Sequence, residues 1–98
     1  KTVGCVKAAT DVLGDKWTPE ILRHFLAGDR VRFCQLQENC GGINPRTLSA
    51  RLSSLETQGI IKRLPTDTTR CEYSITEKGK DLLPVLDSMQ VWSKKYGI

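Results

Sequence analysis

The hydrophobic residues of this chain change their spacing once, at Gly59. Before Gly59, apolar side chains recur three or four residues apart, and the clearest stripe is Leu48, Leu52 and Leu55. After it, residues 70–75 alternate between polar and apolar side chains. A repeat near 3.6 residues indicates a helix, and a repeat of two indicates a strand. The pattern therefore predicts a mainly helical α+β domain that contains one β-hairpin.

Capping residues, prolines and glycines mark the helix boundaries. Thr18-Pro19-Glu20 predicts the start of a helix, because it offers a capping hydroxyl, a proline for the first turn and an acid at the positive end. Asn44-Pro45 opens another helix in the same way, and Gly59 supplies its end. The predicted helices cover residues 6–13, 18–27, 33–40, 45–58 and 77–96.

The segment after Gly59 predicts a hairpin and then a long helix. Ile60–Leu64 and residues 70–75 are the two strands, and residues 65–69 form the turn. Thr76-Glu77 caps a final helix that extends to about Tyr96, and Pro84 should kink it. The order helix, break, helix, hairpin is that of a winged helix. It places a helix-turn-helix at about 33–58, a two-stranded wing at about 60–75 and a terminal helix at about 77–96.

Size and charge limit the remaining possibilities. Ninety-eight residues suffice for one core, so we expect a single domain over residues 1–98. Fifteen Lys and Arg against 11 Asp and Glu give a net charge of +4, which permits a polyanionic partner. No apolar run approaches the ~20 residues of a membrane span, and residues 1–9 lack the core of a secretory signal. We therefore expect a cytoplasmic protein with no membrane partner.

The sequence offers no catalytic or metal-binding constellation. Its four cysteines are scattered without a Cys-x-x-Cys pair, and His24 is the single histidine. There is no nucleophile with an adjacent base and no glycine loop for phosphate. We therefore expect reduced thiols, no metal, no cofactor and no enzymatic activity.

The outward face of the helix from residue 45 to 58 indicates DNA binding. At 100° per residue, Arg46, Ala50 and Ser53 lie roughly opposite the leucine stripe. Arginine can pair with guanine, hydroxyls can bond bases or phosphates, and a methyl can contact thymine. The residues predicted to contact DNA on or beside this helix are Asn44, Arg46, Thr47, Ser49, Ala50 and Ser53. The alternatives are a polar face without a partner and a winged helix that binds only proteins, which would expose Leu, Phe or acids.

The final helix carries two apolar stripes. One has spacings of three and four residues over two heptads and is the predicted dimer interface: Leu82, Val85, Met89, Trp92 and Tyr96. Leu83 and Leu86 form the second stripe beside it. One stripe can bury against its own domain while the other requires a partner. The alternative is that both stripes cover a single core.

Three further side chains have structural interpretations. Trp17 precedes a capped helix and is expected to pack in the core. His24 is off the apolar face and is expected at the surface. Arg51 borders the leucine stripe, so a structural ion pair is favoured over a base contact, and a phosphate contact is the alternative.

Several stretches together resemble one family over essentially the whole chain. They are Leu13–Phe33 with Gly-x-Lys-Trp, Arg46–Arg63 with Leu-x-x-Leu-Glu-x-x-Gly, and Glu72–Met89 with Glu-Tyr-x-Ile-Thr-x-x-Gly. The chain resembles the HxlR-type winged-helix regulators, relatives of the MarR family. The resemblance implies a homodimer formed through the terminal helices, binding to a two-fold-related operator in double-stranded DNA, and regulation of transcription.

The resemblance also concerns the wing and the first cysteine. Arg70 matches the family's wing arginine, although the tip Pro65–Arg70 lacks the usual Pro-Pro pair, so helix contacts are better supported than wing contacts. Cys5 stands where several such regulators sense oxidants or electrophiles. Proximity to a helix start and to Lys7 favours a reactive thiolate there. The alternatives are an inert thiol at the dimer interface and a small-molecule effector in the dimer cleft.

Overall fold

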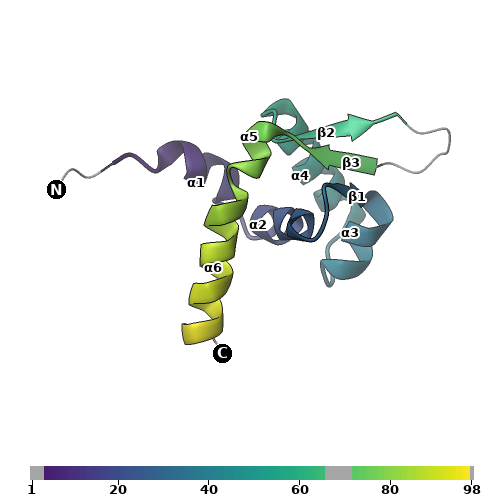
Figure 1. The fold of residues 1–98 in the computed structure, drawn as a ribbon. Coiled ribbons are helices and arrows are strands. Elements are labelled where there is room, and N and C mark those ends of the chain that lie inside the picture. The colour runs from purple at the N-terminus through teal and green to yellow at the C-terminus, as the bar shows by residue number, and fades with distance from the viewer. Residues whose placement is uncertain (1–3, 66–71, 98) are drawn as a thin grey trace.

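A computed structural model describes residues 4–65 and 72–97. Helices surround one face of a small sheet, as Figure 1 shows. The elements in chain order are α1 (Lys7–Leu13), α2 (Trp17–Leu22), the 3₁₀ helix η1 (Arg23–Leu26), β1 (Arg30–Arg32), α3 (Phe33–Asn39), α4 (Pro45–Thr57), β2 (Ile61–Leu64), β3 (Glu72–Ile75), α5 (Glu77–Lys80) and α6 (Leu83–Tyr96). The predicted mainly helical α+β fold with a winged helix is confirmed.

The sheet has three antiparallel strands in the order β1-β3-β2, where the sequence predicts two. The hairpin pairs Ile61 with Ile75 and Leu64 with Glu72. The additional strand β1 pairs Val31 with Tyr73 on the other edge of β3. β1 has three residues, too few for an alternating pattern to stand out, and it forms because β3 offers it an open edge.

The core lies between the sheet and the helices. The leucine stripe of α4 is buried as predicted, with exposed fractions of 0% for Leu48 and Leu52 and 2% for Leu55. Fifteen apolar side chains of the described residues form this core, namely Ile21, Leu22, Phe25, Val31, Leu36, Cys40, Ile43, Leu48, Leu52, Leu55, Ile60, Ile61, Tyr73, Ile75 and Leu86. The helix-turn-helix and the wing therefore share one core.

The second helix begins earlier than predicted, and its cap is a different residue. α2 starts at Trp17, and the backbone amides of Trp17 and Thr18 donate to the carboxylate of Asp15. The Thr18 hydroxyl donates to Asp15 instead of capping the helix, so the prediction for Thr18 is wrong. The turn after Leu22 tightens into the 3₁₀ helix η1, which ends before Gly28.

Pro84 separates two helices and does not kink one. Thr76 caps α5 as predicted, because its hydroxyl oxygen accepts from the amide of Gly79. α5 ends at Lys80, and α6 begins at Leu83 with Pro84 in its first turn. A proline is tolerated there because the first-turn amides have no partner within the helix. The single long helix predicted from Thr76 is therefore wrong.

Gly79 lets α5 approach the sheet closely. A Cβ at this position would collide with the Ile60 carbonyl oxygen and the Ile75 side chain. The Thr76 hydroxyl lies 2.6 Å from the carbonyl oxygen of Gly59 and 2.9 Å from that of Ile60. This contact explains the Thr-x-x-Gly motif, because it packs the start of α5 against the junction between α4 and β2.

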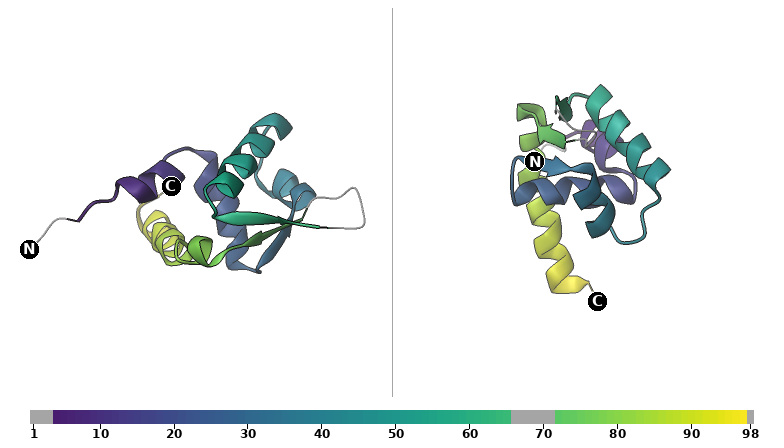
Figure 2. Two further views of the ribbon diagram at one scale, coloured as in Figure 1. Left: turned by 90° about the horizontal axis from the view of Figure 1, so that it is seen from above. Right: turned by 90° about the vertical axis from the view of Figure 1, so that its right-hand side faces the viewer.

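The two ends of the domain carry different elements. The hairpin extends from one side, whereas α1 lies toward the other, near α6 (Figure 2). α6 leads away from the sheet to the carboxyl end (Figure 1). α2 packs between these regions and contacts α1, α4 and α6.

Candidate nucleic-acid interface

The turn between α3 and α4 sets the position of the candidate recognition helix. Gly42 takes a φ of +82°, which favours glycine, and Ile43 turns back into the core with 5% exposure. The Asn44 side-chain oxygen then accepts a 2.8 Å hydrogen bond from the Arg46 amide. Pro45 occupies the first turn. The predicted cap and proline are thus confirmed, and they fix where α4 begins.

The polar residues of α4 lie outside the core. Arg46, Ser49, Ala50 and Ser53 are exposed, and Thr47 is half-buried. Asn44 is also exposed, although its side-chain oxygen is engaged in the cap. No acid occurs in α4 before Glu56, so the face carries one full positive charge at Arg46 among small polar groups. Such a surface can approach a polyanion closely.

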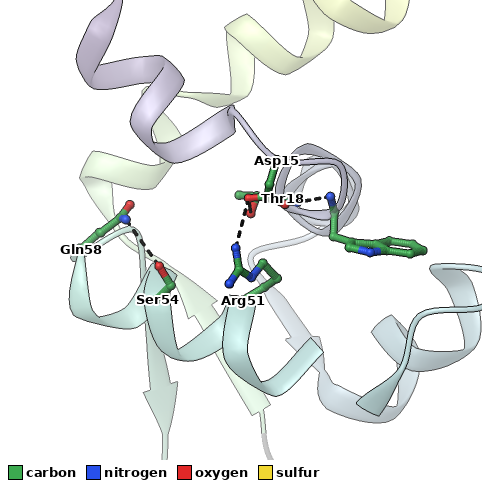
Figure 3. Close-up of polar contacts among 6 residues, drawn as sticks. Asp15, Thr18, Arg51, Ser54 and Gln58 are labelled. Atoms are coloured by element: carbon green, nitrogen blue, oxygen red, sulfur yellow. Dashed lines mark hydrogen bonds and ion pairs between the residues drawn. The ribbon is translucent and has the colours of Figure 1, made fainter. Parts of the chain in front are cut away.

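Arg51 makes the ion pair that the sequence favours. Its Nη1 lies 3.7 Å from Oδ2 of Asp15, in the link before α2 (Figure 3). Burial opposes ionisation of Asp15, but hydrogen bonds from Thr18 and Trp17 and the charge of Arg51 outweigh it, so its pKa is lowered. Asp15 is therefore a carboxylate at neutral pH. A hollow on this side of α4 is lined by Asp15, Trp17, Arg46, Thr47, Ala50 and Arg51.

Strand β1 adds two cations that sequence reasoning missed. Arg30 and Arg32 of β1 are exposed, and their guanidinium groups lie 3.7 and 3.5 Å from the Glu72 carboxylate. Their signal in the sequence is the run Arg-Val-Arg, in which only the valine is apolar. Lys62 and Arg63 of β2 are exposed as well. The predicted wing contact Arg70 lies outside the described residues.

Two side chains predicted from the sequence differ in their surroundings. Trp17 is half-buried and packs against the edge of the core, in partial agreement with its predicted place. His24 is half-buried, and its Nε2 is buried without a hydrogen-bond partner among the described residues. Burial, with the charge of Arg23, lowers the pKa of His24. His24 thus lies at the edge of the surface, in partial agreement with its predicted place.

The two stripes of α6 have different surroundings in the isolated chain. Leu86 is buried with 3% exposure, and Leu83 packs against the edge of the core. Most of the other stripe is exposed: Val85 41%, Met89 43%, Trp92 64% and Tyr96 62%. Leu82 is the exception, because it packs against its own core. The alternative that both stripes cover one core is thus excluded for these four residues.

The described cysteines differ in exposure. Cys5 is exposed immediately before α1, and its sulfur accepts from the Lys7 amide at 3.5 Å. Cys34 is exposed on α3. Cys40 is buried, and burial raises the pKa of its thiol. Cys71 lies outside the described residues.

Residues 4–65 and 72–97 contain neither a metal-binding cluster nor a membrane-spanning helix. No group of three His, Cys, Asp or Glu side chains there could hold a metal ion. In the same residues, no helix is long and apolar enough to cross a membrane.

The model of the HxlR-like helix-turn-helix family matches residues 12–98. The chain belongs to this family. It is 36% identical to the HTH-type transcriptional regulator YvaP of Bacillus subtilis over 90 residues, which cover 90% of this chain and 82% of YvaP. A second HTH-type transcriptional regulator, from Methanothermobacter thermautotrophicus, is 36% identical over 94 residues, covering 94% and 71% of the two chains.

Solved structures show the same fold. The redox regulator HypR in its oxidised form superposes with a TM-score of 0.85 at 33% identity, over 92% of this chain and 94% of HypR. The reduced transcriptional regulator YodB from B. subtilis gives a TM-score of 0.75 at 30% identity, over 96% and 95% of the chains. Like its relatives, this HxlR-like protein is a helix-turn-helix transcriptional regulator that binds DNA.

Proposed function

We propose that the protein is a cytoplasmic, dimeric regulator that inserts α4 into the major groove of an operator. The exposed face of α4 is the main support for this proposal. It is free of acids from Pro45 to Leu55, and the Asn44 cap and the buried leucines hold it rigidly. The competing function, a module that binds only proteins, predicts exposed Leu, Phe or acids on this helix.

Each residue predicted to contact DNA then has a role that its chemistry permits. Arg46 pairs with guanine or a phosphate, and Thr47, Ser49 and Ser53 bond base edges or phosphates. Ala50 contacts a thymine methyl, and Asn44 offers its amide NH₂ to the DNA backbone. Arg70 reaches the minor groove or the backbone from the wing.

The second copy of the chain covers the exposed stripe of α6. An apolar surface that includes two aromatic rings, Trp92 and Tyr96, at a centroid distance of 5.3 Å is typical of a protein interface. A two-fold axis there places the recognition helices in successive major grooves, about 34–36 Å apart. The operator is then an inverted repeat.

A response to oxidants or electrophiles at Cys5 is the second part of the proposal. Its support is the exposure of Cys5 and the similarity to HypR, a redox regulator, and to YodB, which has been crystallised after diamide treatment and with bound quinone. The alternative effector is a small molecule bound between the protomers.

The test of DNA binding is a titration of a labelled promoter fragment from beside the protein's own gene. A dimer that neutralises about 6–10 phosphates should lose about 10³–10⁵-fold in affinity between 50 and 200 mM salt. Anisotropy titrations at four salt concentrations give the slope. Absence of binding to such fragments, or binding that is independent of salt, would exclude the proposed function.

A further inference from the structure

Asp15 lies in the link between α1 and α2 and is held by three hydrogen bonds. Its Oδ1 accepts from the amides of Trp17 and Thr18, each at 2.8 Å, and its Oδ2 accepts from the Thr18 hydroxyl. Thr18 is itself buried, with 3% exposure. The carboxylate is therefore fixed relative to the start of α2 (Figure 3).

The remaining interaction of this carboxylate reaches the recognition helix. Oδ2 of Asp15 lies 3.7 Å from Nη1 of Arg51, on the turn of α4 that follows Thr47. The Nε of Arg51 is buried and has no hydrogen-bond partner in the described part of the chain. Asp15 is thus the charged group that orients the Arg51 guanidinium, at the hollow that Arg46, Thr47 and Ala50 also line.

The leucine stripe alone does not set the orientation of α4. Apolar contacts of Leu48, Leu52 and Leu55 hold α4 against the core, but hydrophobic attraction is non-directional. Close packing of these leucines limits small rotations and shifts of α4 along its axis, but a leucine side chain makes no directional contact that sets the exact orientation of the helix. A fixed carboxylate facing a cation on α4 resists these motions, because the distance between the charges depends on them.

We propose that Asp15 is a positioning residue for DNA recognition, which holds α4 through Arg51 in the orientation needed to distinguish one sequence from another. This inference rests on the proposed function and adds to it a residue outside the helix-turn-helix. It also gives a role to the Gly-Asp-Lys-Trp stretch that leads into α2. The side chain of Asp15 need not contact DNA.

A variant that lacks the charge of Asp15 distinguishes a positioning role from a purely electrostatic effect on DNA binding. Asp15→Asn keeps an oxygen that can cap α2, since Asn caps helices as well as Asp does. It removes a negative charge near a DNA-binding face, and electrostatics alone would then strengthen binding to all DNA. Loss of positioning instead weakens binding to the specific sequence only.

The experiment compares Asp15→Asn with Asp11→Asn, an exposed acid on α1 that makes the same change in charge. The probes are the promoter fragment and a scrambled duplex of equal length. We expect Asp15→Asn to lower the ratio of the two affinities by about five- to twenty-fold, the product of a modest loss at each half-site. We expect Asp11→Asn to leave the ratio unchanged. An equal gain in both affinities for Asp15→Asn would overturn the proposal.

Arg51→Gln should lower the affinity ratio as much as Asp15→Asn, and the double variant should lower it no further. A readout without DNA separates this inference from the function on which it rests. Hydrogen exchange at the α4 amides should accelerate in Asp15→Asn and not in Asp11→Asn, with both variants folded by circular dichroism. Unchanged exchange would overturn the positioning role, whereas a wild-type protein that binds no promoter fragment would overturn the proposed function.

Discussion

Arg46 combines an anchored backbone amide with an exposed side chain. The amide donates to the Asn44 oxygen, so the first turn of α4 is anchored, while the guanidinium faces solvent beside Thr47 and Ala50. Anchoring matters because arginine selects guanine through two parallel hydrogen bonds with a defined geometry. The nearby Arg51 differs, since Asp15 holds its guanidinium. Two arginines five positions apart on one helix thus have different surroundings.

Replacement of Arg46 should therefore affect affinity directly. Arg46→Ala is expected to cost about 1–3 kcal/mol per half-site and to relax the preference at one base position. Arg46→Lys keeps the charge but not the planar pair of donors, so it should restore phosphate contact and not base selection. Binding to a panel of single-base operator variants measures both effects. Unchanged affinity of Arg46→Ala would remove this residue from the interface.

Helices and strands whose capping residues and apolar spacing lie close together in the sequence could be predicted. The Asn44 cap, Pro45 and the leucine stripe are adjacent in sequence and suffice to define α4 and its exposed face. β1 was missed because three residues become a strand only beside β3, which is 40 residues later in the chain. The partner of Arg51 was also missed, because the ion pair with Asp15 joins residues that are distant in the sequence.

The exposed stripe of α6 leads to a prediction about association. Met89 and Trp92 should lie in the interface of the dimer, where an unpaired charge is costly to bury. Trp92→Glu and Met89→Lys are therefore expected to yield folded monomers with much weaker operator affinity. Gln37→Glu, an exposed position on α3, adds a charge outside this stripe and should remain dimeric. Sedimentation at micromolar concentration is the measurement. A monomeric wild type would contradict the prediction.

Across the whole molecule, the recognition helix and the N-terminal segment are joined through α2. α2 contacts α1, α4 and α6, so it touches the recognition helix, the helix that follows Cys5 and the helix proposed for the dimer interface. Asp15 lies where α1 meets α2, and its ion pair extends this connection to α4. A shift of α1 can therefore reach the recognition helix through the contacts of α2. Cys5 precedes Val6, the N-cap residue of α1, so its thiol lies at the α1 end of these contacts.

Oxidation of Cys5 is expected to change operator binding by this route. Two thiols, one of them Cys5 and the other on the second protomer, lose two protons and two electrons to diamide and form a disulfide, while diamide becomes the hydrazine. The new bond fixes α1 of one subunit to its partner and so alters the distance between the two α4 helices, which an inverted repeat requires to be about 34–36 Å.

Operator titrations with and without diamide test this for the wild type and for Cys5→Ser, with Cys34→Ser as the matched exposed-thiol control. The wild type should change affinity and form a dimer that resists denaturation on non-reducing gels. Cys5→Ser should do neither. Should Cys34→Ser also lose the response, Cys34 is the thiol with which Cys5 pairs. A wild type indifferent to diamide, or a Cys5→Ser variant that responds equally, would leave a small ligand between the protomers as the effector.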